Sequence, residues 1–130
     1  IAGFVGDHCR DGRFASILCA SMPDVRDYGR IETDSDGFVS AFREKDPAHE
    51  GGGLVSCGVY VFSAACLDRL VEMKPVSLEQ DFLAVLPTGS IFCDARAEAF
   101  VDIGTAERFA DGQTLVPEYA GPKSESDNAP

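Results

Sequence analysis

The sequence predicts a domain of the α/β class, with a mixed sheet, a β-hairpin and flanking helices. Apolar runs of strand length alternate with amphipathic segments of helical period, a pattern typical of α/β folds rather than bundles or sandwiches. The longest run, residues 54–62, lacks strict polar alternation and therefore predicts a central strand covered on both faces. Its interior glycine, Gly58, predicts a notch where a ligand approaches the backbone.

The composition argues against several classes of partner. The 130 residues carry a formal net charge of −11, whereas nucleic acids and anionic membranes are bound through basic patches. No apolar stretch reaches the roughly 20 residues that span a bilayer. The five cysteines are scattered and form no Cys-x-x-Cys pair, so neither a zinc site nor a disulfide framework is predicted. We therefore expect a cytoplasmic protein with reduced, mostly buried thiols.

A helix and a strand are predicted at the start of the chain. The helix begins near Ile1, places Ile1, Phe4, Val5 and His8 on one face, and ends near Gly12. We expect His8 to be a surface or helix-end histidine rather than a catalytic base. Residues 14–22 follow as a strand rich in apolar side chains.

Residues 28–33 and 38–44 predict a hairpin, because Asp36-Gly37 supplies the positive φ that its turn requires. The pair Asp34 and Asp36 faintly resembles a calcium loop, but the bidentate acid of such a loop is missing. Turn chemistry is the better explanation. A glycine-rich loop, residues 51–53, then leads to the central strand.

Two helices and two short strands are predicted after the central strand. Ser63 caps the first helix, which ends at Lys74-Pro75, and Ser77 with Gln80 fits the capping box of a second amphipathic helix. The strands are residues 91–93 and 99–101, and a short helix follows at residues 105–109. The last segment, residues 120–130, is predicted to be a disordered polar tail because it has nothing to bury.

Five motifs, in this order, resemble the second half of the sugar-1-phosphate nucleotidylyltransferases. They are Tyr28-Gly29, Phe42-Arg43-Glu44-Lys45, Ser56-Cys57-Gly58-Val59-Tyr60-Val61-Phe62, Ser77-Leu78-Glu79-Gln80-Asp81 and Phe100-Val101-Asp102-Ile103-Gly104-Thr105. The nearest branch handles heptose or mannose 1-phosphates as guanylyltransferases. The resemblance implies an incomplete Rossmann-like nucleotidyltransferase fold, the sugar-binding half, over residues 1–119.

The resemblance also implies a reaction and the residues that serve it. A sugar 1-phosphate oxygen attacks the α-phosphorus of a nucleoside triphosphate and releases pyrophosphate, so catalysis needs placement and charge neutralisation. Lys45 is implied as the catalytic cation that meets the phosphate, and Asp102 as one ligand of the catalytic Mg²⁺. The remaining implied substrate-binding residues are Gly29, Glu44, Ser56, Gly58, Glu79 and Asp81. Without the motifs, Glu44 and Lys45 would be interpreted as a solvated ion pair.

Two departures from the family pattern limit what the resemblance implies. The family has Asn-Ala-Gly where this chain has Ser56-Cys57-Gly58, and a serine hydroxyl replaces the donor and acceptor of an amide. The family's glycine-rich nucleotide loop and first metal-binding aspartate have no counterpart in the sequence. We therefore expect the chain to be inactive alone, and either completed by a separate nucleotide-binding half or no longer catalytic.

Three hypotheses remain open from the sequence. The chain is the sugar 1-phosphate-binding half of a nucleotidylyltransferase, a non-catalytic sugar-phosphate-binding or oligomerising interaction module, or an acidic domain whose motifs persist for packing alone. Sheet physics adds one expectation. Because an uncovered sheet invites pairing with another copy, we expect a homo-oligomer.

Overall fold

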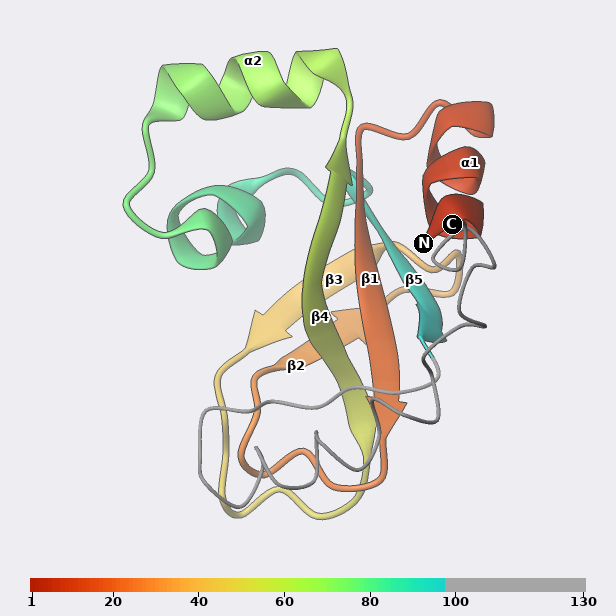
Figure 1. The fold of residues 1–130 in the computed structure, drawn as a ribbon. Coiled ribbons are helices and arrows are strands. Elements are labelled where there is room, and N and C mark those ends of the chain that lie inside the picture. The colour runs from red at the N-terminus through yellow and green to blue at the C-terminus, as the bar shows by residue number, and fades with distance from the viewer. Residues whose placement is uncertain (98–130) are drawn as a thin grey trace, which may run out of the picture. The chain divides into compact units, whose positions relative to one another are not determined.

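One five-stranded mixed sheet organises the part of the chain that the structure, a computed structural model, describes, residues 1–97 (Figure 1). The strand order is β3-β2-β4-β1-β5, which confirms the predicted α/β class with a mixed sheet and a hairpin. The strands are β1 (Ala15–Met22), β2 (Arg30–Thr33), β3 (Val39–Arg43), β4 (Gly53–Phe62) and β5 (Ile91–Ala97). The predicted strand 99–101, helix 105–109, polar tail and Asp102 lie outside the described residues.

The pairing of the strands leaves one side of β4 largely without a neighbour. β1 pairs antiparallel with β4 and parallel with β5. β2 pairs antiparallel with β3 along its length, but it meets β4 at the single pair Ile31 and Leu54. Among the described strands, the edge of β4 from Val55 to Phe62 that faces away from β1 therefore has no ladder partner.

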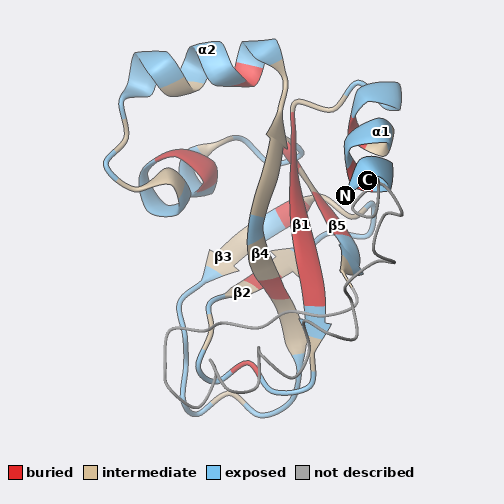
Figure 2. Cartoon of the chain, in the orientation of Figure 1, coloured by how far each residue is buried: buried red, intermediate tan, exposed pale blue. Residues whose placement is uncertain are grey.

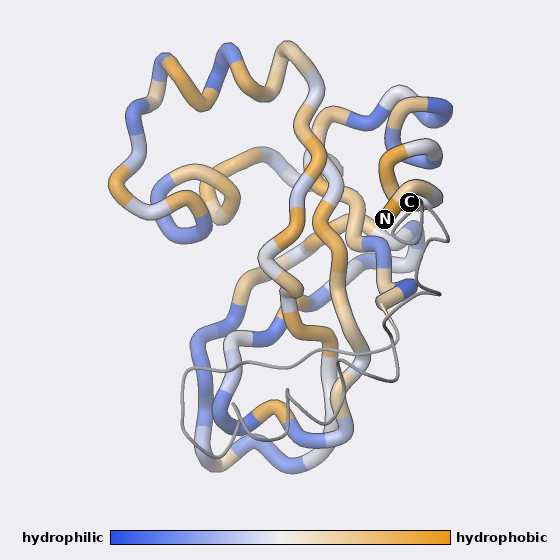
Figure 3. Tube along the Cα trace, viewed as in Figure 1, coloured by the Kyte–Doolittle hydropathy of each residue, from blue (hydrophilic) through white to orange (hydrophobic). Residues whose placement is uncertain are grey.

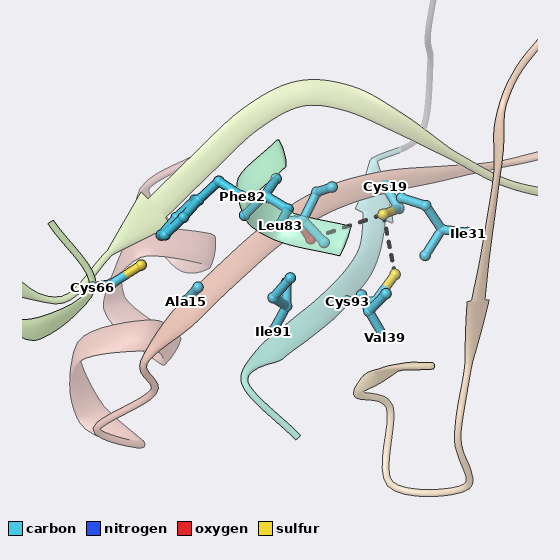
Figure 4. Close-up of a cluster of buried hydrophobic side chains, with 10 residues drawn as sticks. Ala15, Cys19, Ile31, Val39, Cys66, Phe82, Leu83, Ile91 and Cys93 are labelled. Carbon is cyan, nitrogen blue, oxygen red and sulfur yellow. Dashed lines mark hydrogen bonds between the residues drawn. The ribbon is translucent and has the colours of Figure 1, made fainter. Parts of the chain in front are cut away.

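The buried core is built around β1 rather than around β4. The first six residues of β1 are buried (Figure 2). Ala15, Ile17 and Cys19 belong to a core cluster that also holds Phe82 and Leu83 (Figure 4). In β4 only Val55 is buried. β4 is the central strand, as predicted, but the prediction that it is covered on both faces is wrong, because Val55 is its only buried residue.

The first helix, α1 (Ala2–Arg10), is attached to β1 by a buried polar contact. Phe4 and His8 are its buried residues, and His8 Nδ1 lies 2.8 Å from the Ser16 hydroxyl of β1. Ile1 and Val5 are exposed. His8 lies in the last turn of α1, which agrees with the expectation of a helix-end histidine, but it is buried and not at the surface. A hydroxyl inside the fold provides the hydrogen-bond partner that lets the imidazole be buried.

The hairpin of β2 and β3 confirms the predicted turn. Gly37 has φ +89°, and the Asp34 carboxylate accepts hydrogen bonds from the N–H groups of Asp36 and Phe38 at 2.9 and 3.0 Å. The carboxylate is thus used by the turn backbone. The tip of the hairpin reaches β5, where the N–H of Cys93 donates to the Gly37 carbonyl at 2.9 Å.

Helix α2 (Ala64–Met73) starts and ends at the predicted residues. The Ser63 hydroxyl accepts from the N–H of Cys66 at 3.2 Å, and Lys74 ends the helix in the left-handed conformation with φ 47°. Hydrophobic positions recur along the helix (Figure 3), and Leu67 and Val71 are exposed, Val71 by 71%. In the described part, no helix is long and apolar enough to cross a membrane.

The predicted second amphipathic helix is instead a pair of irregular turns. A π-helical turn, η1 (Leu78–Phe82), continues into a 3-10 turn, η2 (Leu83–Val85). Phe82 and Leu83 are both buried in the core although they are consecutive. Phe82 ends the π-helical turn and Leu83 begins the 3-10 turn, so the two buried side chains lie at the point where the helical pattern changes.

Candidate substrate-binding site

The notch predicted at Gly58 is a β-bulge. Cys19 of β1 pairs with Ser56, whereas the preceding residue, Leu18, pairs with Val59, so Cys57 and Gly58 are additional residues in β4. Gly58 has φ +72°, a conformation that favours glycine. The Ser56 hydroxyl accepts a hydrogen bond from the Gly58 N–H at 3.1 Å. A Cβ at Gly58 would meet no atom within 4 Å, so the bulge is open on that side.

A chain of side-chain hydrogen bonds runs from the bulge to η1. The hydroxyls of Ser56 and Tyr60 lie 3.4 Å apart, and the Tyr60 hydroxyl donates to Glu79 Oε1 at 2.8 Å. Burial, together with the hydrogen bond to the Glu79 carboxylate, raises the pKa of Tyr60 to about 12. The tyrosine therefore keeps its proton near neutral pH and holds the Glu79 carboxylate beside β4.

The start of η1 is shaped by two caps. The Ser77 hydroxyl accepts from the N–H of Gln80 at 3.2 Å, as predicted. The return contact comes from Asp81, whose Oδ2 accepts from the N–H groups of Val76 and Ser77 at 3.2 and 2.8 Å. The Asp81 side chain is thus hydrogen-bonded to the backbone in this structure. Gln80 contributes only its backbone N–H to the cap, and its side chain contacts another segment.

The Gln80 side chain connects η1 to the end of β3. Its Nε2 donates to Glu44 Oε1 at 3.4 Å. Lys45 follows as an exposed residue, and among the described residues no side chain forms a hydrogen bond or ion pair with its ammonium group. Gly29 lies against the same strand end, because a Cβ there would stand 3.3 Å from the Arg43 carbonyl oxygen. Gly29 therefore allows the segment before β2 to pack closely on β3.

Five of the predicted site residues separate into two groups. Ser56 and Glu79 are connected through Tyr60, and Glu44 reaches the same turn through Gln80. Gly29 and Asp81 have backbone roles. A shallow hollow between β3 and η2 contains none of the predicted residues; its lining is Val39, Ser40, Ala41, Phe42, Leu83, Ala84, Leu86, Pro87, Thr88 and Ile91.

The described residues do not form a metal site. Within residues 1–97, no three His, Cys, Asp or Glu side chains are grouped so that they could hold an ion. Asp102, the residue that the resemblance implies for Mg²⁺, lies outside this range. A Mg²⁺ site cannot be assembled from the described part of the chain alone.

Two residues that join the site were missed in the sequence. Tyr60 was interpreted only as part of an apolar strand, and Gln80 only as part of a capping box. A signal was present for Tyr60, because a phenol in an otherwise apolar run usually finds a hydrogen-bond partner when it is partly buried. The contact of Gln80 with Glu44 joins residues that are 36 positions apart, and no local pattern predicts it.

Comparison with known proteins defines the class of this chain. Residues 3–118 match the family model described as nucleotidyl transferase. The match covers most of the 130 residues, and the chain therefore belongs to this family. The resemblance to sugar-1-phosphate nucleotidylyltransferases is thus confirmed.

Two relatives of this chain are mannose-1-phosphate guanylyltransferases. The catalytic subunit beta of Drosophila melanogaster is 28% identical over 109 residues, which are 83% of this chain and 29% of that protein. The mannose-1-phosphate guanyltransferase of Debaryomyces hansenii is 28% identical over 111 residues, 83% of this chain and 30% of that protein. The chain thus spans less than a third of the length of these relatives.

Solved structures show the same fold. HddC from Yersinia pseudotuberculosis superposes with a TM-score of 0.73 at 24% identity, covering 88% of this chain and 48% of that chain. Its complex with GMP-PN gives a TM-score of 0.72 at 23% identity, with the same coverage of both chains. This agreement confirms the nucleotidyltransferase-like fold.

Proposed function

We propose that this chain is the sugar 1-phosphate-binding part of a sugar-1-phosphate nucleotidylyltransferase. The observation that carries the proposal is the connection of three distant segments at one place, the end of β3, the bulge of β4 and the turn η1. Glu44, Ser56 and Glu79 come from these three segments, and Tyr60 and Gln80 hold them. A surface ion pair or a turn would not require such a connection.

The chemistry of the three side chains suits a sugar. One oxygen of Glu44 and one of Glu79 are held by Gln80 and Tyr60. Their second oxygens have no hydrogen-bond partner among the described residues, and ionised carboxylates accept hydrogen bonds from hydroxyl groups. Ser56 at the bulge can both donate and accept. The site thus offers acceptors for several sugar hydroxyls.

Lys45 supplies the positive charge that a phosphate needs. The other cation at this end of β3, Arg43, is occupied by an ion pair with Glu32 at 3.2 Å. In a chain with a net charge of −11, a placed cation is required to meet a sugar phosphate. We assign Lys45 to the phosphate, and Asp102 remains a proposed Mg²⁺ ligand outside the described residues.

The transfer reaction itself needs groups that this chain is not proposed to supply. The nucleoside triphosphate has to be held so that the sugar phosphate oxygen can approach its α-phosphorus in line. We propose that a separate nucleotide-binding half provides this, and that the chain alone does not transfer nucleotides. Sugar phosphate binding, rather than turnover, is therefore the property to measure.

Calorimetric titration of the whole chain with mannose 1-phosphate and with a heptose 1-phosphate, with and without Mg²⁺, tests the proposal. We expect Lys45→Ala to weaken binding at least about tenfold, because a charge-assisted hydrogen bond contributes about 1.5–3 kcal/mol. Lys74→Ala removes the same charge at the end of α2 and should bind as the wild type does. Absence of heat from the folded wild type, or equal affinity of Lys45→Ala, would contradict the proposal.

A second candidate function, a self-associating module, is favoured by the free edge of β4. That edge has no ladder partner beyond Leu54 among the described strands, and residues 55–62 carry no charge. Uncharged free edges pair readily with another strand. Sedimentation of the chain at micromolar concentrations should show a dimer or a larger homo-oligomer, and a strict monomer would exclude this function.

A further inference from the structure

Two buried thiols lie in direct contact at a place that the proposed site does not use. The Sγ atoms of Cys19 in β1 and Cys93 in β5 are 3.1 Å apart and share a hydrogen bond (Figure 4). Cys19 is completely buried and Cys93 is 7% exposed. Both side chains belong to the core cluster.

The irregular pairing of β1 with β5 explains the close approach. Cys93 is opposite Ile17 in the parallel ladder, so Cys19 lies diagonally across from it on the same face. The register shifts between Leu18 and Ala20, where β5 contains one additional residue. From the other side, the Gly37 carbonyl accepts the N–H of Cys93 at 2.9 Å. The backbone thus holds the two thiols toward each other.

The contact also makes the two thiols chemically different. The shared hydrogen bond lowers the pKa of Cys93 and, together with burial, raises the pKa of Cys19. In this contact the Cys93 thiol donates to the Cys19 sulfur. Cys93 is 7% exposed whereas Cys19 is completely buried, so Cys93 is the thiol that a peroxide reaches first.

We propose that Cys19 and Cys93 are a redox-active pair that closes to a disulfide when the protein meets a hydroperoxide. The Cys93 thiolate attacks the peroxide, and its sulfur is oxidised to a sulfenic acid while hydroxide leaves. The Cys19 sulfur then displaces the hydroxyl group of the sulfenic acid, and the thiol proton leaves with it as water. Two thiols and one hydrogen peroxide thus give one disulfide and two waters.

The required movement is small. The bond length of a disulfide is about 2.05 Å, so the two sulfur atoms have to approach by about 1 Å. The reacting sulfurs lie on neighbouring strands, β1 and β5. A third thiol, Cys57 in the bulge of β4, is half-buried, and it is the competitor that the experiment must distinguish.

Peptide mapping after peroxide treatment tests the pair in the wild-type chain. The folded protein is treated with hydrogen peroxide, alkylated in denaturant and digested with trypsin without reduction. Cys19 falls in Phe14–Arg26, Cys93 in Leu70–Arg96, and Cys57 with Cys66 in Asp46–Arg69. We expect Phe14–Arg26 linked to Leu70–Arg96, at a mass lower by two hydrogens, and loss of this species after dithiothreitol.

Cys66 provides the internal control, because it is equally buried and has no thiol in hydrogen-bond reach among the described residues. In Cys57→Ser, peptide Asp46–Arg69 reports Cys66 alone. We expect it to remain fully alkylated while Cys19 and Cys93 are lost together. In the wild type, disulfide links from Cys57 to Cys19 or Cys93 in place of the Cys19–Cys93 link would overturn the proposal. In Cys57→Ser, alkylation of Cys19 and Cys93 to the same extent as Cys66 would also overturn it.

Discussion

β1 and β4 are neighbours in the sheet, but the first six residues of β1 are buried whereas β4 buries Val55 alone. The residues of β1 are on average smaller, including serine, cysteine and alanine. Small side chains let α1 approach one face of β1 through His8 and Ser16, while Ile17 and Cys19 enter the core on the other. β4 carries larger apolar and aromatic residues and remains half-exposed.

The difference shows that burial follows from what covers a strand and not from how apolar the strand is. β1 has a neighbouring strand on both edges, and α1 and the core cover its faces. β4 has a bulge at Cys57 and Gly58 and a free edge beyond Leu54. The strand with the lower burial is the one that presents polar atoms for the proposed site.

The largest expected effect is on stability when a large side chain is removed from β1. Ile17 is completely buried, so Ile17→Ala should lower the free energy of unfolding by about 2–5 kcal/mol through the cavity that it leaves. Val61→Ala in half-buried β4 should cost about 1 kcal/mol. Urea unfolding followed by circular dichroism measures both, and equal losses would refute the contrast between the strands.

A smaller effect separates two glycines that have the same space around them. A Cβ at Gly58 or at Gly6 would meet no atom within 4 Å, but only Gly58 has a positive φ, +72°. Gly58→Ala should destabilise the fold by about 1–2 kcal/mol because of its left-handed backbone. Gly6→Ala lies inside α1 and should stabilise it by about 0.5–1 kcal/mol. The urea midpoints of the two variants should shift in opposite directions from that of the wild type. An increase for both would show that the bulge relaxes to accept the alanine.

The smallest expected effect is a pH dependence carried by the contact of α1 with β1. Burial, and to a lesser degree Arg13, lowers the pKa of His8 below its ordinary value of 6.5. The folded state thus favours the neutral imidazole, so the stability contributed by His8 is complete above pH 6.5 and is lost as the pH falls below it.

The urea concentration at the unfolding midpoint should therefore decrease when the pH is lowered from 7.5 to 5.5 in the wild type. His8→Gln should flatten this dependence, because the amide does not titrate in that range. His49→Gln removes the other histidine and serves as the control, with the wild-type profile expected. A profile that His8→Gln leaves unchanged would assign the pH dependence to other groups.

Local signals in the sequence predicted most elements because their causes are local. Asp36-Gly37 specifies its turn, Ser63 caps α2, and Pro87 begins the turn that leads into β5. The same signals failed at residues 77–86, where the capping pattern was correct but the regular helix was not. Phe82 and Leu83 both enter the core, and that demand comes from the sheet on which they pack.

Motif order, periodicity and glycine positions are properties of the chain, and they predicted the family, the class of fold, the position of β4 in the sheet and the notch at Gly58. The burial of β1, the links from Tyr60 and Gln80 to Ser56, Glu79 and Glu44, and the contact of Cys19 with Cys93 arise only when the chain is folded. These contacts connect residues far apart in the chain. Their partners are chosen by strand register and packing, which no single segment encodes.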